Sequence, residues 1–80
     1  MPVIQQVPMP EPGRSMYIVG VFESDGKPGI NYRFSTNPHM LFTEYYRIEG
    51  DTVITPEHHF PLPFLLNFLH ANELISTNEL

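Results

Sequence analysis

Two β-type segments on either side of a turn-rich stretch restrict the fold of this chain more than any other part of its sequence. Residues 16–23 (MYIVGVFE) are mostly β-branched or aromatic, and their apolar side chains fall on both faces of an extended strand. Residues 30–35 (INYRFS) alternate between apolar and polar side chains, which is typical of a strand with one buried face. Residues 24–29 (SDGKPG) between them are rich in turn formers. The pattern predicts a β-hairpin, with a bulge or a close backbone contact at Gly20.

The C-terminal part of the chain shows helical periodicity. Its apolar side chains cluster on one face of a helix: Phe64, Leu65, Phe68, Leu69 and Ile75. Prolines at positions 61 and 63 flank the entry to this segment. We therefore predict an amphipathic helix over residues 64–75 and a frayed end at residues 76–80. Three residues on apolar faces are predicted to be buried: Phe34, Phe68 and Leu69.

The middle of the chain is less clearly patterned. Residues 45–49 and 52–55 flank a Gly-Asp dipeptide, and a two-residue connection of this composition predicts a second hairpin. Residues 38–44 fit two structures. An Asn-Pro pair at their start can cap and open a short helix, whereas the Phe, Thr and Tyr residues that follow favour a strand. The sequence alone leaves this stretch open.

Four prolines in residues 1–13 predict an extended arm, since proline fixes φ and removes a hydrogen-bond donor. This arm is either a loosely ordered leader or a segment whose Val3, Ile4 and Val7 lie along a sheet edge or along a partner. Residues 14–80 are predicted to form a single α+β domain. The expected architecture is a small antiparallel β-meander of three to four strands, with one C-terminal amphipathic helix packed on the sheet.

Charge and composition narrow the classes of function. Nine acidic residues against four basic ones give a net charge of −5, and the cations are spread through the chain, which disfavours a nucleic-acid partner. The absence of cysteine excludes disulfides, thiolate metal ligands and a cysteine nucleophile, and it favours a reducing compartment. The most apolar stretch, residues 60–71, is too short and interrupted to span a bilayer. With no signal peptide evident, we expect a cytoplasmic protein that does not contact a membrane.

No signature of catalysis stands out, because the chain lacks a P-loop, a dinucleotide-binding glycine motif and a nucleophile elbow. The tandem pair His58-His59 offers imidazoles that zinc could bind, with His39 or His70 completing the set. Adjacent residues, however, point to opposite sides of a strand. We therefore predict that the pair is not a metal site, with one imidazole exposed and the other packed against Phe60. No catalytic residue and no cofactor is expected.

Tyrosines and arginines alternate in the middle of the chain, and both residue types are enriched at binding hot spots. Four residues of the predicted strands form the predicted binding site: Asn31, Arg33, Tyr45 and Arg47. The alternative is that the tyrosine rings only cap a small core. Residues 16–22 also have one apolar face more than a single helix can cover. A partner protein, a second copy of the chain or the N-terminal arm should cover that face.

These observations favour a non-catalytic protein-binding module that works by occupying the surface of another protein. The small size and acidity of the chain suit a phage or mobile-element accessory protein that binds and inhibits or modulates a host protein. Two alternatives stay open. One is a homo-oligomeric structural or assembly protein, in which the sheet contacts a self-copy, and the other is a small His-dependent metal-binding protein.

Overall fold

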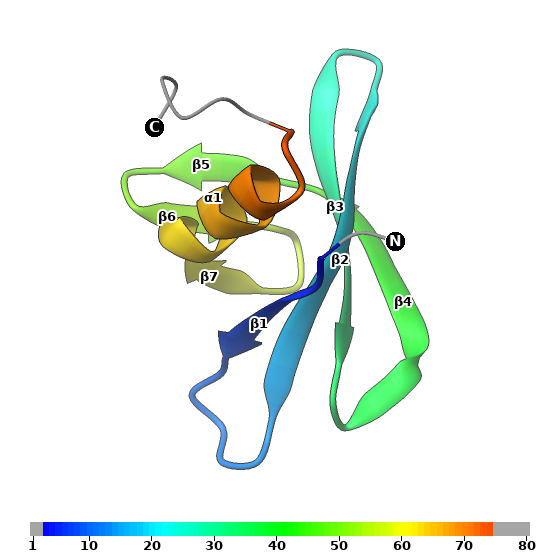
Figure 1. The fold of residues 1–80 in the computed structure, drawn as a ribbon, viewed down its shortest axis with the longest axis vertical. Helices are drawn as coiled ribbons and strands as arrows, with labels where there is room; N and C mark the ends of the chain where they lie inside the picture. The colour runs from blue at the N-terminus through cyan, green and yellow to red at the C-terminus, as the bar shows by residue number, and fades with distance from the viewer. Residues whose placement is uncertain (1–2, 75–80) are drawn as a thin grey trace.

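The computed structural model describes residues 3–74, which form two antiparallel sheets and one helix (Figure 1). Sheet A has four strands in sequence order: β1 (Gln5–Pro8), β2 (Ser15–Ser24), β3 (Lys27–Phe34) and β4 (Asn37–Tyr45). Sheet B and the helix follow: β5 (Arg47–Glu49), β6 (Thr52–Ile54), β7 (His59–Pro61) and α1 (Leu62–Ala71). The helix and sheet B lie on the same side of sheet A (Figure 1). The predicted α+β class, with an antiparallel meander and one C-terminal helix packed on it, is confirmed.

The β2–β3 hairpin turns tightly at Asp25-Gly26, where both residues have positive φ angles of 56° and 75°. Two positive φ angles in a two-residue loop are typical of a type I′ turn, which matches the twist of the flanking strands. Residues 27–29, predicted as part of the turn, are therefore the start of β3. The register shifts between Ile18 and Gly20, so the irregularity predicted at Gly20 is a β-bulge.

Residues 38–44, which the sequence left open, belong to strand β4. β4 pairs with β3 as far as Tyr45, and the N–H of Tyr46 then donates to the carbonyl of Pro28 (3.1 Å). Beyond this point the chain leaves sheet A. The hairpin predicted around Gly50 is confirmed as β5–β6. It pairs with β7 in a separate sheet and does not extend the meander.

The N-terminal arm contributes a strand to sheet A. β1 pairs with the first residues of β2, and Val7 is fully buried in the core, whereas Val3 and Ile4 are exposed. The side chain of Asn72, just after the helix, forms hydrogen bonds with both the N–H and the carbonyl of Val3. Its Oδ1 accepts a hydrogen bond from the Val3 N–H (2.6 Å), and its Nδ2 donates to the Val3 carbonyl (3.0 Å). Of the two structures considered for the arm, the edge segment is the one that forms.

The core lies between the inner face of sheet A, sheet B and α1. Buried apolar side chains come from all three layers: Val7, Met16, Ile18, Ile30, Tyr32, Phe34, Val53, Phe60, Leu65 and Phe68. The predicted burial of Phe34 and Phe68 is confirmed. Leu69 is only half-buried, so its predicted full burial is wrong. It lies on the flank of a helix that directs Leu65 and Phe68 into the core.

Helix α1 begins at Leu62, two residues before the predicted start. The two prolines do not delay it, because Pro61 is the N-cap and Pro63 lies in the first turn. The N–H groups of a first turn have no partner within the helix, so proline loses nothing there.

The helix ends at Ala71, before the predicted end at Ile75. Glu73 has a φ of 59°, and a left-handed residue just after a helix interrupts its hydrogen-bond pattern. Ile75 itself, and the fraying predicted after it, lie outside the described residues. In the described part of the chain, no helix is long and apolar enough to cross a membrane.

The central place of Phe68 in the core gives a first test. Its ring is 1% exposed. A Phe68→Ala exchange should lower the unfolding free energy by about 3–5 kcal/mol, which is most of the stability of a domain this small. Chemical denaturation followed by circular dichroism measures the loss. Ile48→Ala, at an exposed side chain of β5, is the control and should cost less than about 1 kcal/mol. A Phe68→Ala protein as stable as the wild type would contradict this packing.

Candidate functional site

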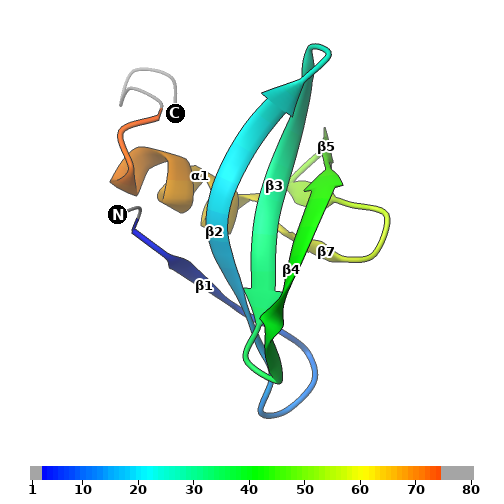
Figure 2. The same cartoon turned by 90° about the vertical axis from the view of Figure 1, so that its right-hand side faces the viewer.

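Sheet A has an outer face that no other element of the described chain covers (Figure 2). In β3 the residues Ile30, Tyr32 and Phe34 are buried, so the residues that alternate with them point away from the core. The registers of β2 and β4 place their own outward residues beside those of β3. The outer face is defined by these residues of the three strands: Tyr17, Gly20, Phe22, Lys27, Gly29, Asn31, Arg33, Leu41, Thr43 and Tyr45.

Phe22 and Tyr45 form an aromatic cluster at one end of the outer face. Their ring centroids are 5.8 Å apart. The Nζ of Lys27 lies 5.8 Å from the Tyr45 centroid, within the range of a cation–π contact. The Phe22 ring lies against Gly29, and a side chain at that position would collide with it. The glycine of β3 thus lets Phe22 lie across the strand, next to Tyr45.

Asn31 and Arg33 are held by hydrogen bonds further along β3. The hydroxyl of Thr43 donates to the Oδ1 of Asn31 (3.0 Å), and the Nη1 of Arg33 donates to the carbonyl of Pro38 (2.9 Å). Both side chains are half-buried. The outer face therefore combines an aromatic end with an ordered polar end.

Three of the four residues predicted to form the binding site lie on the outer face: Asn31, Arg33 and Tyr45. The fourth, Arg47, lies in β5 of sheet B, where its Nε and Nη2 both donate to the Oε2 of Glu49 (3.2 and 3.0 Å). Arg47 would share a face with Tyr45 only if the strand continued to pair in sheet A. The chain instead leaves sheet A after Tyr46.

The outer face differs in charge from the rest of the molecule. Two of the four cations, Arg14 and Arg47, form ion pairs with glutamates (2.6 and 3.0 Å). The other two, Lys27 and Arg33, form no ion pair with the described residues, and both lie on the outer face. No acidic residue belongs to this face, although the chain has a net charge of −5. A cationic and aromatic surface thus lies on an acidic protein.

An open depression of about 490 Å³ adjoins the aromatic cluster at the edge of sheet A. Its lining combines residues of β2 and β4 with one loop proline: Phe22, Ser24, Thr43, Glu44, Tyr45 and Pro56. Among residues 3–74, β4 has no neighbouring strand on this side. The depression therefore extends the outer face to the free edge of the sheet.

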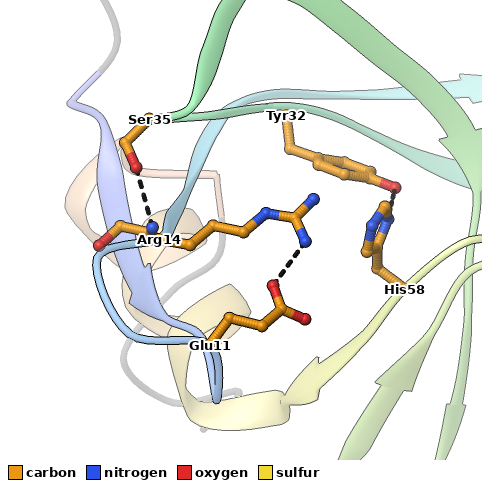
Figure 3. A network of polar contacts seen from close by, with 6 residues as sticks. Glu11, Arg14, Tyr32, Ser35 and His58 are labelled. Carbon is orange, nitrogen blue, oxygen red and sulfur yellow. Dashed lines mark hydrogen bonds and ion pairs between the residues drawn. The ribbon is translucent and has the colours of Figure 1, made fainter.

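A second polar group lies in the interior, around Tyr32 (Figure 3). This tyrosine is fully buried. Its hydroxyl lies 2.6 Å from the Oε1 of Glu44 and 2.8 Å from the Nδ1 of His58. An ionised carboxylate can only accept, so with Glu44 ionised Tyr32 donates to Glu44 and the Nδ1–H of His58 donates to Tyr32. The hydrogen bonds join sheet A to the loop before β7.

A tight turn holds His58 in this position. The hydroxyl of Thr55 accepts from the N–H of His58 (2.9 Å) and donates to its carbonyl (2.8 Å). The imidazole packs against Phe34 and Phe42, with centroid distances of 4.6 and 5.5 Å. The predicted contact with Phe60 is therefore wrong, because the loop turns His58 toward sheet A. His59 is the exposed member of the pair.

Arg14, in the loop between β1 and β2, lies next to the side chains of Phe34 and His58. Its guanidinium carbon lies 3.9 Å from the centroid of the Phe34 ring, and its Nη1 donates to the Oε2 of Glu11 (2.6 Å). Figure 3 shows the guanidinium directed toward Tyr32 and His58. A fixed positive charge therefore lies beside the imidazole.

This environment favours the neutral forms of His58 and Tyr32. Burial lowers the pKa of His58, and the charge of Arg14 lowers it further, against the opposing effect of nearby glutamates. Burial raises the pKa of Tyr32 well above its usual value, and the hydrogen bond with Glu44 raises it further. Because the Tyr32 side chain has no exposed surface, a substrate cannot reach its hydroxyl. The hydrogen bonds of Tyr32 with Glu44 and His58 link sheet A to the loop before β7.

Sequence reasoning did not identify this group. Glu44 and His58 lie 12 and 26 residues from Tyr32, so no local spacing connects the three. One signal was present: alternation places Tyr32 on the buried face of β3, and a buried hydroxyl requires a hydrogen-bond partner. No group of three or more His, Cys, Asp or Glu side chains in residues 3–74 is arranged to hold a metal ion.

Comparison with models of known protein families, with curated proteins and with solved structures finds no match for this chain. The class of the molecule is therefore defined by its own geometry. It is a small α+β domain with an uncovered sheet face that is cationic and aromatic.

His58 is expected to link stability to pH. Because its pKa is lower in the folded state than in the unfolded state, the unfolded chain binds the proton more readily. Its stabilising contribution is therefore present above its ordinary pKa of about 6.5 and is lost as the pH falls through the lower folded value. The melting temperature should drop between about pH 7.5 and about pH 5.5.

Two substitutions test the source of this drop. His58→Asn keeps a donor for Tyr32 and cannot be protonated in this range, so it should reduce the drop in melting temperature. His59→Asn, at the exposed neighbour, should leave the drop unchanged. If the His58→Asn protein loses as much stability on acidification as the wild type, the pH dependence arises elsewhere.

Proposed function

We propose that this protein is a non-catalytic protein-binding module that docks another protein on the outer face of sheet A. The observation that supports the proposal is the face that the described chain leaves uncovered (Figure 2). Aromatic side chains and cations without an ion-pair partner among the described residues lie together on it. Aromatic and arginine side chains are the groups that dominate binding energy in interfaces, and both kinds lie on this face.

The position of the N-terminal arm supports an external partner. The second apolar face of residues 16–22 could be covered by a partner protein, by a second copy or by the N-terminal arm. Only the arm belongs to the same chain. β1 pairs with the side of β2 and does not lie over it, and Val3 is bound to Asn72 after the helix. Among the described residues, the arm therefore leaves the outer face free.

The chemistry of the face fits a protein better than a nucleic acid. Two cations on a chain of net charge −5 give too little attraction for a phosphate backbone. Tyr45 and Arg33 offer a broad apolar ring and a planar donor group, which together recognise mixed apolar and acidic protein surfaces. A role as a phage or mobile-element accessory protein acting on a host protein stays a hypothesis within this proposal.

Substitutions on the two sheets test the assignment. Arg33→Ala and Tyr45→Ala should each leave the fold intact, and at least one should weaken binding by about 1 kcal/mol or more, which is roughly fivefold. A partner captured from the native host is purified, and its affinity for each variant is measured by surface plasmon resonance. Arg47→Ala removes an exposed arginine from sheet B and is the matched control. Equal affinities for all three variants and the wild type would reject the outer face as the site.

A further inference from the structure

In the described part of the chain, strand β4 forms a long free edge of sheet A. It has nine residues, whereas β1 at the opposite edge has four and ends in Pro8. Proteins usually protect an edge strand with lysine, proline, a bulge or a covering element, because its unpaired backbone groups can bind another strand. β1 shows such protection by its length and its proline. The protection of β4 depends on which of its backbone groups are unpaired and on the side chains beside them.

Alternation shows which backbone groups of β4 are free. Tyr46 lies opposite Pro28 and donates its N–H to the Pro28 carbonyl (3.1 Å). In an antiparallel ladder, hydrogen-bonded pairs alternate with pairs that do not bond. The N–H and carbonyl groups of Leu41, Thr43 and Tyr45 therefore point to the free edge. None of them takes part in the turn and loop hydrogen bonds of residues 3–74.

Residues 42–45 are the part of this edge that pairs regularly with β3, and Leu41 directly precedes them. Residues 41–45 contain no lysine or proline, and the register irregularity of β4 lies between Asn37 and Phe42. Their only charged residue, Glu44, is turned inward and bound to Tyr32. Leu41 and Tyr45 are 46% and 44% exposed. An apolar, unprotected strand edge is a surface that binds a further strand.

We propose that β4 pairs with β4 of a second copy of the chain, antiparallel and about a two-fold axis at Thr43. The residues with free backbone groups must face one another in such a pair, and a centre at Thr43 places Thr43 and its exposed neighbours Leu41 and Tyr45 in the contact. Thr43 then lies opposite Thr43 of the second copy. Leu41 lies opposite its Tyr45, and Phe42 opposite its Glu44. No two like charges are directly opposed.

The side chains at this edge are complementary to themselves. On the outer face, Leu41 of the second copy lies opposite Tyr45, beside Phe22. This is the place of the open depression of about 490 Å³. An exposed leucine and the hollow that can receive it therefore meet twice across the two-fold axis. The central Thr–Thr pair is a favourable cross-strand pair. This self-complementarity identifies a second copy as the occupant of the edge.

Dimerisation through β4 does not depend on the proposed function. It would join two sheets of four strands into one sheet of eight, cover each outer face at its Tyr45 edge, and leave the rest of both faces, including Arg33, exposed. A contact based on five residues of each copy is smaller than the roughly 800 Å² per partner of a standard interface. The dimer should therefore dissociate on dilution, with both species present between about 10 µM and about 1 mM.

Sedimentation equilibrium of the intact chain over this range tests the proposal. The wild type should shift from monomer to dimer. Thr43→Lys places like charges opposite each other at the axis and should hold the protein in the monomer at least tenfold higher in concentration. Thr36→Lys adds the same charge to an exposed residue of the β3–β4 turn and should behave as the wild type. Unchanged melting curves show that both variants are folded.

A cysteine at the axis gives an independent readout, since the chain has no other thiol. In the proposed dimer the two Cα atoms of residue 43 are about 5.5 Å apart, within the range that a disulfide spans. Under mild oxidation Thr43→Cys should form a covalent dimer at least tenfold faster than Thr36→Cys. A wild-type protein that stays monomeric at about 1 mM, or equal rates for the two cysteine variants, would overturn the proposal. Failure here would leave the Arg33 and Tyr45 test of the outer face unaffected.

Discussion

The burial of one tyrosine hydroxyl is the constraint on which the arrangement of the two sheets depends. Tyr32 lies in the middle of sheet A, stacked on Phe42 with ring centroids 5.0 Å apart. A hydroxyl in this position costs free energy unless it is hydrogen-bonded. Glu44 satisfies it from the same sheet, and His58 satisfies it from the loop that leads to β7. The same contact that removes an unpaired polar group thus fixes sheet B and the start of α1 against sheet A.

The parts of the fold that local chemistry decides could be predicted from the sequence. The β2–β3 hairpin follows from alternation and from an Asp-Gly turn, and both signals lie within a few residues of the structure that they produce. Residues 38–44 carry opposing local signals, and pairing with β3 decides between them. The separate second sheet depends on where the chain leaves sheet A, after Tyr46. That departure reflects packing between distant segments, which no short sequence window contains.

The residues of the candidate site also differ in whether local sequence patterns or pairing between distant segments determine their positions. Asn31 and Arg33 were predicted on one face because β3 alternates regularly, and the structure places them there. Arg47 was predicted with them but lies on sheet B, because its position depended on strand pairing beyond Tyr45. The contact of Phe22 with Tyr45 needs three strands in register and a glycine under the ring. Sequence therefore identified Asn31, Arg33 and Tyr45 of the outer face and missed Phe22, the ring that packs against Tyr45.

The two hydrogen bonds between Val3 and Asn72 have a topological consequence. They join residues 69 positions apart, so the described chain starts and finishes at one place on the molecule. Each strand of sheet A pairs with its neighbour in sequence, and so does each strand of sheet B. The two ends of the described chain are therefore adjacent, and every strand pair joins strands that are consecutive in the sequence. A circular permutant with new ends at Asp25-Gly26 would keep every strand pair while changing the link between β2 and β3 from covalent to noncovalent.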